Sequence, residues 1–265
     1  MLIAQLSDPH LRPAGRLYQR LVDSNALFAQ AVAQLRTLVP APDLVLLTGD
    51  VVEEGTAEDY AFARTLLAQL PAPLLVLPGN HDARAAFRAA FADHAHLPAQ
   101  GSLHFAVDHG PLRIVGLDVT VPGEHHGVVD EAAAGWLEAT LAAAPERPTL
   151  LMMHQPPIRS GISCIDAYRC FGEVRLAAVI ARHPQVERVL CGHVHRAMQA
   201  RFGGTLLMTA PSTCTAIGLR LDTGEEEGVS FLEPPAFLLH RWSAEEGLVT
   251  HHVPIGRFPG PLPFF

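Results

Sequence analysis

Features that mark membrane and secreted proteins are missing from this chain of 265 residues. It contains no apolar stretch long enough to cross a bilayer. Its N-terminus lacks the basic region and the long apolar run of a signal peptide. The sequence therefore predicts a cytoplasmic protein with no membrane partner.

Clusters of basic residues are missing as well. The formal net charge is −8, and the basic side chains are scattered along the chain. A protein that binds a polyanion usually presents a basic patch, so long nucleic acid is excluded as a partner. A small phosphate ester stays compatible with this charge, because bound metal ions would reverse the local field.

Paired cysteines and internal repeats are also missing. The four cysteines form no C-x-x-C pair, and we expect free thiols in a reducing compartment. The hydrophobic content of 49% is enough to bury one sizeable core. Histidine, in contrast, is abundant, with 15 copies, and this number needs an explanation of its own.

Short apolar runs alternate with helical patterns through about the first 210 residues. The runs are rich in Val, Ile and Leu, which predicts buried strands over residues 2–6, 44–47, 74–77, 112–117, 149–153, 186–191 and 206–209. Apolar residues at helical spacing lie between them, and Thr56-x-x-Asp59 resembles a capping box at the start of one helix. The alternation predicts a layered α/β fold.

The composition and pattern of the sequence change after about residue 211. Residues 222–228 are acidic and turn-like, and residues 237–239 and 248–253 predict a terminal pair of strands. The last nine residues, 257–265, contain three prolines and three phenylalanines. This tail is either a frayed end or an arm packed on a neighbouring subunit, since exposed Phe is costly.

Five of the predicted strands are followed by polar residues of the kinds that bind metals. In chain order these residues are Asp8, His10, Asp50, Asn80, His154, His193 and His195. Ligands of α/β sheets gather at the carboxyl ends of the strands. We therefore expect these seven residues, scattered in the sequence, to converge on one polar site.

The residue types suit a shared metal site. Imidazole and carboxylate groups bind Zn, Mn or Fe, and an Asn carbonyl can complete the coordination. Asp8-x-His10 and His193-x-His195 each place two side chains on one side of an extended segment, because side chains in a strand repeat with a period of two. The carboxylate of Asp50 has two oxygens and can bridge two ions.

Taken together, these blocks resemble the calcineurin-like metallophosphoesterase family. The family pattern is D-x-H, G-D, G-N-H-[D/E], H and G-H-x-H, and all five blocks occur here in that order within about residues 1–210. One block alone is weak, but five in order, each after an apolar run, are specific. The resemblance implies a four-layer α/β/β/α sandwich in a single domain, residues 1–265. Its catalytic core would cover about residues 1–210, and a small C-terminal extension about residues 211–265.

Within the family, four stretches look like the bacterial class III cyclic-nucleotide phosphodiesterase and glycerophosphodiesterase branch: residues 6–10, 43–50, 78–82 and 154–157. Protein Ser/Thr phosphatases tend to show G-D-x-V-D-R-G, whereas residues 49–55 here read G-D-V-V-E-E-G, which argues against that branch. Gln155 is a departure, because many relatives carry a second His there. The change puts in doubt the outer contacts that tune the metal ligands, more than catalysis itself, because the ligand His154 is kept.

The resemblance implies two metal ions, divalent or of mixed valence, that share Asp50 and a bridging hydroxide. One ion would take Asp8, His10, Asp50 and His195, and the other Asp50, Asn80, His154 and His193. Such ions lower the pKa of water, orient a hydroxide in line with phosphorus and neutralise charge on the phosphoryl oxygens. Fe, Mn, Zn and Co all accept these ligands, so the sequence does not identify the metals.

Asn80 and His81 would bind the phosphate of the substrate, and His81 would be the catalytic residue that protonates the leaving oxygen. A structural role for His81 is the alternative. Asp82 is expected to cap a helix or to orient a histidine. Asp23 and Asn25 could cap the first helix or reach the substrate.

Two loops have alternative interpretations. His125 and His126 lie in a glycine-rich loop, and we expect them on the surface. Residues 158–171, directly after His154, either form a wall of the site through Ile side chains, Tyr168 and Phe171, or make a plain surface excursion.

The expected function is hydrolysis of a small phosphodiester, and a 3',5'-cyclic nucleotide and a glycerophosphodiester remain open as substrates. A phosphomonoesterase is the enzymatic alternative. The arginines near the motif blocks are scattered rather than convergent, which disfavours a dianionic monoester: Arg12, Arg16, Arg20, Arg159 and Arg169. The non-enzymatic alternative is an inactive scaffold with the same fold, and no expected ligand is missing to favour it. The branch resemblance suggests a homo-oligomer, a dimer or larger.

Overall fold

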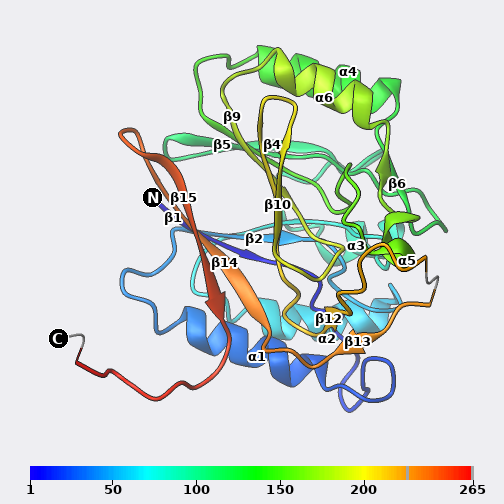
Figure 1. Cartoon of the computed structure of the whole chain (residues 1–265), viewed down its shortest axis with the longest axis vertical. Coiled ribbons are helices and arrows are strands. Elements are labelled where there is room, and N and C mark those ends of the chain that lie inside the picture. Colours follow the sequence, from blue (N-terminus) through cyan, green and yellow to red (C-terminus); the bar gives the residue numbers. More distant parts are fainter. Residues whose placement is uncertain (225–226, 264–265) are drawn as a thin grey trace.

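Two β-sheets lie face to face in the computed structural model, which describes residues 1–224 and 227–263 (Figure 1). The five-stranded sheet has the order β15 (Gly247–Pro254), β14 (Ala236–Ser243), β1 (Leu2–Leu6), β2 (Leu44–Thr48), β3 (Leu74–Leu77). The six-stranded sheet has the order β10 (Met198–Phe202), β11 (Thr205–Thr209), β9 (Val186–Cys191), β7 (Thr149–Met152), β5 (Leu112–Gly116), β4 (Phe105–His109).

Helices cover the outer face of each sheet (Figure 1). The five-stranded sheet carries α1 (Ser24–Leu35), α2 (Ala57–Leu67) and α3 (Arg84–Ala90), and the six-stranded sheet carries α4 (Glu131–Ala142) and α6 (Glu173–Ala181). The result is the predicted four-layer α/β/β/α sandwich. The loops contain the short helix α5 (Ser163–Asp166) and two small ladders, β6 (Gly127–Val128) with β8 (Cys170–Phe171) and β12 (Ala216–Ile217) with β13 (Ser230–Phe231).

Three apolar cores hold the layers together. Leu46, Leu77, Ile114 and Leu150 belong to the core between the two sheets, and all are buried. The other two cores lie between each sheet and its helices. Strands buried on both faces read as continuous apolar runs, which is why the sequence revealed them.

Helix starts follow local capping chemistry. The Thr56 hydroxyl accepts a hydrogen bond from the Asp59 N–H at 3.2 Å, and the Asp59 carboxylate accepts one from the Thr56 N–H at 3.0 Å. This reciprocal pair confirms the predicted capping box of α2. Asp23 caps α1 by accepting a hydrogen bond from Ala26 N–H at 2.9 Å.

Strand direction brings the motif blocks together. β1, β2 and β3 are parallel to one another, and so are β5, β7, β9 and β11. The carboxyl ends of parallel strands lie at one edge of a sheet, and the candidate ligands directly follow β1, β2, β3, β7 and β9. The fold therefore delivers all five blocks to one rim of the sandwich.

The C-terminal strands complete the first sheet. β14 pairs antiparallel with β1 and β15 pairs antiparallel with β14, so the predicted terminal strand pair is confirmed. The expected division at about residue 210 stays a prediction. Within the described chain, no helix is both long and apolar enough to cross a bilayer.

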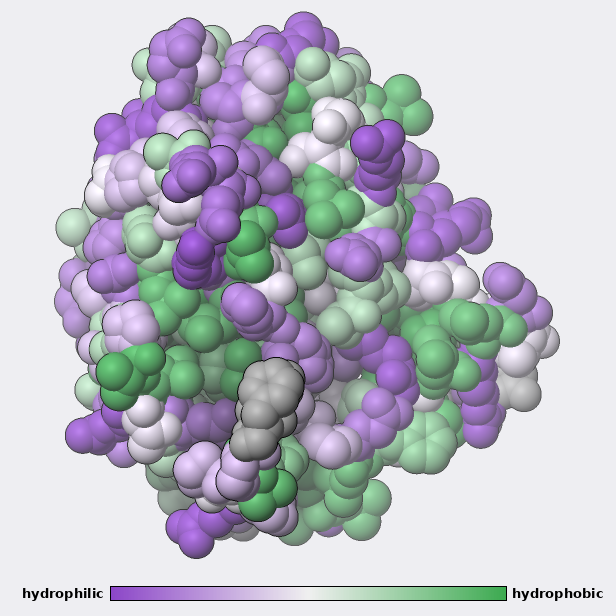
Figure 2. Space-filling view, turned by 60° about the vertical axis from the view of Figure 1, so that its left-hand side comes forward, coloured by the Kyte–Doolittle hydropathy of each residue, from purple (hydrophilic) through white to green (hydrophobic). Residues whose placement is uncertain are grey.

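The tail after β15 exposes apolar side chains. Phe258 is 62% exposed and Leu262 is 77% exposed. On the face seen in Figure 2, apolar residues are interspersed with polar ones. The expected homo-oligomer stays a prediction. Residues 225–226 of the expected acidic turn and residues 264–265 of the tail lie outside the described chain.

Candidate metal centre

The seven candidate ligands converge in two overlapping groups of metal-binding atoms. Asp8, His10, Asp50 and His195 form the first donor group, and Asp50, His154 and His193 form the second; within each group the ligand atoms lie within 4.8 Å of one another. The amide oxygen of Asn80 joins the second group, 3.2 Å from His154 Nε2 and 3.0 Å from His193 Nδ1. Asp50 alone belongs to both groups, which is the position that a bridging ligand would need.

The backbone at this rim is strained. Five candidate ligands have positive φ angles: Asp8 (51°), His10 (45°), Asp50 (49°), His193 (71°) and His195 (56°). Non-glycine residues rarely adopt this left-handed region, and such strain concentrates at functional sites. The turns after the strands therefore aim these side chains inward at some conformational cost.

Two glycines of the motif blocks allow close approach. Gly49 has φ of 93°, and a Cβ there would collide with the His154 ring. A Cβ at Gly79 would collide with the Asp50 carboxylate. Both glycines are therefore needed for the donor atoms to come together, beyond the tight turns that the sequence suggested.

Backbone and carboxylate groups fix the ring orientation of three histidines. Nδ1 of His10 lies 2.7 Å from Oε2 of Glu53, Nδ1 of His154 lies 2.7 Å from the Thr48 carbonyl, and Nδ1 of His195 lies 2.9 Å from the Thr215 carbonyl. Each acceptor holds the proton on Nδ1 and leaves Nε2 for the centre. This is the usual outer support of metal-binding histidines.

The electrostatics of the centre call for a cation. Burial alone would raise the pKa of Asp50, but His154 and His81 outweigh it and hold this pKa well below its usual range. Burial alone would lower the pKa of His154, but the carboxylates of Asp50 and Asp8 raise it to about 9. A proton on His154 thus balances the negative charge of the two carboxylates. A bound metal ion could take the place of that proton.

One buried atom lacks a partner. His193 is 5% exposed, and its Nε2 has no hydrogen-bond partner among the described residues. Burial lowers the pKa of His193 to about 3, which keeps the ring neutral and its lone pair available. Together with the carboxylates, the other imidazoles and the amide oxygen, this neutral ring fits a first-row transition metal.

His81 lies beside the donor groups. Its Nδ1 lies 3.0 Å from the Glu53 carbonyl, and its backbone N–H donates to Asp50 at 2.9 Å. Burial would lower the pKa of His81, but Asp50 and Glu53 outweigh it and raise this pKa. The ring is therefore oriented with Nε2 available, and its two carboxylate neighbours favour the protonated form.

A cleft of about 320 Å³ opens over the two donor groups, and we call it the metal cleft. It is lined by His10, Asp50, Asn80, His81, His193 and His195. Tyr168 and Ile165 of the 158–171 loop also line it, in agreement with a wall of the site. Phe171 does not line the cleft; its ring packs under the Arg169 guanidinium at 4.4 Å.

His125 lies on the surface, as the sequence predicted, but it also has contacts at the rim of the metal cleft that the sequence did not predict. The side chain is exposed, but its Nδ1 lies 3.1 Å from Asn80 Nδ2 and its ring contacts Tyr168. Gln155, the departure from the family pattern, donates to the His125 carbonyl at 3.0 Å. Gln155 therefore positions a residue at the rim of the metal cleft, a contact that no sequence signal announced.

Asp82 neither caps a helix nor orients a histidine, the two roles that were expected of it. Its carboxylate accepts hydrogen bonds from the N–H groups of Val51 and Gly79 and from the Tyr60 hydroxyl, at 3.0, 2.9 and 2.7 Å. Because the acceptor oxygens are used there, Asp82 ties the second motif block to the third. The residue before α3 is Ala83, which makes no side-chain cap.

Asn25 does not reach the metal cleft. Its amide exchanges two hydrogen bonds with the Arg12 backbone, both at 3.0 Å. Asp23 is occupied in capping α1. Both residues support the loop after the first motif block.

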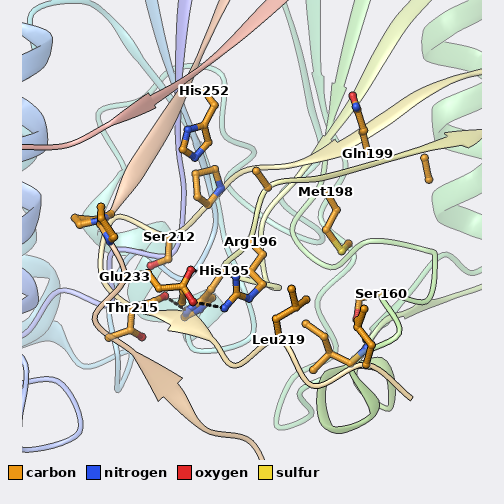
Figure 3. A pocket seen from close by; sticks show the side chains of 18 of the residues that line it. Ser160, His195, Arg196, Met198, Gln199, Ser212, Thr215, Leu219, Glu233 and His252 are labelled. Atoms are coloured by element: carbon orange, nitrogen blue, oxygen red, sulfur yellow. Dashed lines mark hydrogen bonds and ion pairs between the residues drawn. The ribbon is translucent and has the colours of Figure 1, made fainter. Parts of the chain in front are cut away.

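A larger cavity, of about 740 Å³, is also lined by His195 (Figure 3). Arg196 and Glu233 line it and form an ion pair at 2.5 Å, and the Nε of Arg196 contacts the Ile217 carbonyl. His195 is the one candidate ligand among the residues that line it. Arg196 therefore anchors the segment that presents His195, and the chemistry belongs to the smaller metal cleft.

Comparisons with known proteins agree with this geometry. The calcineurin-like phosphoesterase family model matches residues 1–197. A probable glycerophosphodiester phosphodiesterase of Arcobacter nitrofigilis is 35% identical over 268 residues, which cover 100% of this chain and 97% of the relative. A 3',5'-cyclic adenosine monophosphate phosphodiesterase of Escherichia coli is 34% identical over 215 residues, covering 80% of this chain and 76% of the relative.

Solved structures share the fold at lower identity. A dimetal phosphatase from Danio rerio superposes with a TM-score of 0.64 at 15% identity, covering 97% of this chain and 99% of that one. An anchor protein of the Plasmodium inner membrane complex superposes with a TM-score of 0.62 at 14% identity, covering 97% and 89%. The fold alone therefore does not decide the activity. The family model and the two relatives described above, each more than 30% identical, do decide the family: this chain belongs to the calcineurin-like phosphoesterases.

Proposed function

We propose that this protein is a dinuclear metal-dependent hydrolase of small phosphodiesters. The observation that carries the proposal is the shared position of Asp50 in two donor groups below one cleft. The 35% and 34% identical relatives carry phosphodiesterase names, which supports the same reaction class.

The first donor group would hold one metal ion, and the second group with Asn80 would hold the other. Bound there, two ions would lower the pKa of water and offset charge on the phosphoryl oxygens. Membership of the family makes the chain metal-dependent, while the number of ions and the choice among Fe, Mn, Zn and Co are part of the proposal.

The chain's own residues would bind the phosphate and move a proton. Asn80 and His81 line the metal cleft, and the contact of His81 Nδ1 with the Glu53 carbonyl leaves Nε2 free to hold a proton. We assign His81 to protonating the leaving oxygen, with Glu53 keeping its ring in place. Asp8 and His154 are fully buried, so these two donors lie below the part of the centre that the metal cleft opens to solvent.

The charge of the metal cleft favours a diester over a monoester. A monoester carries close to two negative charges near neutral pH and a diester carries one. Among the described residues, no arginine lines the metal cleft. Arg12 is paired with Glu54 at 2.8 Å, and Arg159 lines the larger cavity. A dianion would lack the convergent guanidinium groups that usually hold it.

The test is a pair of chromogenic esters that share one leaving group. We expect a higher kcat/KM for the diester than for the monoester. Strong chelation should abolish hydrolysis, and Mn or Co should restore it. Full activity in a demonstrably metal-free protein would refute the mechanism. A clear monoester preference would make the chain a phosphomonoesterase, and metal binding without turnover of either ester would make it a scaffold. The cytoplasmic location stays a prediction.

A further inference from the structure

A row of polar side chains lies in the apolar core between the two sheets, and these side chains have no part in the function proposed so far. We call it the polar row, and its members, in spatial order, are Thr250, His240, Gln5, Thr48 and Ser7. Thr250 is half-buried, and the other four are fully buried. Buried polar groups cost free energy unless each finds a partner, so a row of this length in an apolar core calls for an explanation.

The Gln5 amide sets the direction of the hydrogen bonds in the outer half of the row. Its Nε2 lies 3.0 Å from the Cys191 carbonyl, which only accepts, so the nitrogen must face that side. Gln5 Oε1 therefore accepts a hydrogen bond from His240 Nε2, at 3.1 Å. Burial lowers the pKa of His240 to about 3, so its ring is neutral and Nδ1 accepts from the Thr250 hydroxyl at 2.8 Å.

The inner half of the row points the same way. Gln5 Nε2 also donates to Thr48 Oγ1 at 3.1 Å, and the Thr48 hydroxyl donates to Ser7 Oγ at 2.8 Å. The Leu6 carbonyl, the other acceptor near the Thr48 hydroxyl, is farther away, at 3.3 Å. A metal-binding carboxylate is ionised and only accepts, so the Ser7 hydroxyl donates to Asp8 Oδ2, at 2.5 Å. All the hydrogen bonds of the row therefore donate toward Asp8, and each polarises the next.

The inner end of the row fixes one oxygen of Asp8. Oδ2 accepts from the Ser7 hydroxyl and lies 3.1 Å from the His193 N–H, whereas Oδ1 lies 3.5 Å from His195 Nε2. Gly192 makes room for this contact, because a Cβ there would collide with both Ser7 Oγ and Asp8 Oδ2. The row thus determines which oxygen of Asp8 is turned toward the other donors of its group.

We propose that the polar row is a positioning network that holds Asp8 Oδ1 toward the ion of the first donor group, so that His240, on a C-terminal strand, helps to set the affinity for that ion. The inference rests on the proposed function and adds positioning residues to it. In the described chain, no side-chain hydrogen bond joins the row to Asp50 or to the other donors of the second group. The effect should therefore be confined to the first ion.

The discriminating variant lies at the far end of the row. Ser7→Ala would weaken binding of the first ion even without a network, because Ser7 touches Asp8 itself. His240→Leu removes only a remote donor, after which nothing keeps the Gln5 amide in its orientation. His240→Gln is the conservative rescue, since its amide can again donate to Gln5 Oε1 and accept from the Thr250 hydroxyl.

The matched control is Ile3→Val. Ile3 is the cross-strand neighbour of His240 and belongs to the same core between the sheets. The change shortens a buried side chain by one carbon and touches no polar group. Thermal unfolding of the metal-free proteins then shows how much each variant costs in stability alone.

Competition with a graded series of chelators measures the affinity for each ion, and the binding step lost in Asp8→Ala identifies the ion of the first donor group. We expect His240→Leu to weaken that step by about tenfold, at the lower end of the effect of outer supports of metal ligands, and to leave the other step unchanged. Saturating Mn should restore most of kcat. His240→Gln and Ile3→Val should keep both steps.

A second variant covers the case in which His240→Leu does not fold. Thr48→Val interrupts the row with a side chain of the same shape and keeps the Thr48 carbonyl that holds His154. It should weaken the same binding step by about tenfold or more.

An unchanged first step in a folded His240→Leu or Thr48→Val variant would overturn the positioning role, and so would equal losses in both steps. In that case the unchanged protein still binds metal and hydrolyses a diester, and the proposed function stands. If the unchanged protein bound no metal or hydrolysed no phosphate ester, both the proposed function and this inference would fail. The two failures are therefore distinguishable.

Discussion

The two donor groups of the candidate centre share Asp50 but differ in charge. The first group adds the carboxylate of Asp8, and a further carboxylate, that of Glu53, lies 2.7 Å from the ring of His10. The second group adds the neutral amide of Asn80. One ion would thus face two carboxylates with a third behind them, and the other ion a single shared carboxylate.

The two groups differ in burial as well. Asp8 is fully buried, and both of its oxygens lie within hydrogen-bond distance of the His193 N–H, at 3.0 and 3.1 Å. Asn80 is half-buried, and its amide nitrogen contacts the exposed ring of His125. These differences in charge and burial predict that affinity and access are divided between the groups. We expect the first group to hold its ion more tightly, and the second to face the substrate.

Removing the shared carboxylate should have the largest effect. Asp50→Ala takes one ligand from each donor group, so both ions should be lost and hydrolysis should fall by about 10³-fold or more, in line with the several kcal/mol of metal assistance. Metal analysis of the purified variant together with kcat measures this. Asp8→Ala is the matched control and should deplete mainly the first group. Two ions at full occupancy in Asp50→Ala would show that Asp50 is not the bridge.

Removing His81 should separate turnover from metal binding. His81→Ala leaves all seven candidate ligands in place, so metal content should be kept while kcat falls by about 10²–10⁴-fold, the usual worth of general acid–base help. The loss should shrink for a diester with a very good leaving group, which needs no proton. Equal losses for good and poor leaving groups would point to phosphate binding alone.

The positions of the donor groups could be predicted from the sequence, because they depend on the strands. Each candidate ligand follows a buried strand, so the apolar runs and the rule that ligands gather at the carboxyl ends of strands were enough to expect the seven together. Strands buried on both faces also made the layers readable. The Thr56 cap of α2 could also be predicted, because its two partners lie only three residues apart in the sequence.

Contacts between distant loops could not be predicted. His125 meets Asn80 across 45 residues, and Gln155 meets the His125 carbonyl across 30. Asp82 reaches Val51 across 31 residues, where a capping role was expected. Such contacts depend on how loops pack after the sheets have formed, and no periodicity in the sequence encodes that packing.

Weakening the support of the first donor group should have a moderate effect. Glu53→Gln removes the charge next to His10 Nδ1 but keeps the size of the side chain. We expect the affinity for the more tightly held ion to fall by about 10–100-fold, as for other outer supports of metal-binding histidines. Competition with a graded series of chelators measures this, and Glu54→Gln, at a surface ion pair with Arg12, is the matched control. Unchanged affinity in Glu53→Gln would mean that the carbonyl contacts of Thr215 and Thr48 to their histidines support metal binding without the Glu53 carboxylate.

The smallest expected effect comes from making the second donor group resemble the first. Asn80→Asp adds one negative charge beside His154 and His193 at nearly constant size. The gain in attraction for the second ion is partly offset by desolvation of the new carboxylate, so we expect the affinity to rise by about tenfold. The difference between the two binding steps in a calorimetric titration with Mn should narrow. Asn80→Ala, which removes the oxygen altogether, should widen that difference and serves as the opposite control. If both variants leave the weaker step unchanged, Asn80 is not a ligand of the second ion, and the division of affinity and access between the two groups is wrong.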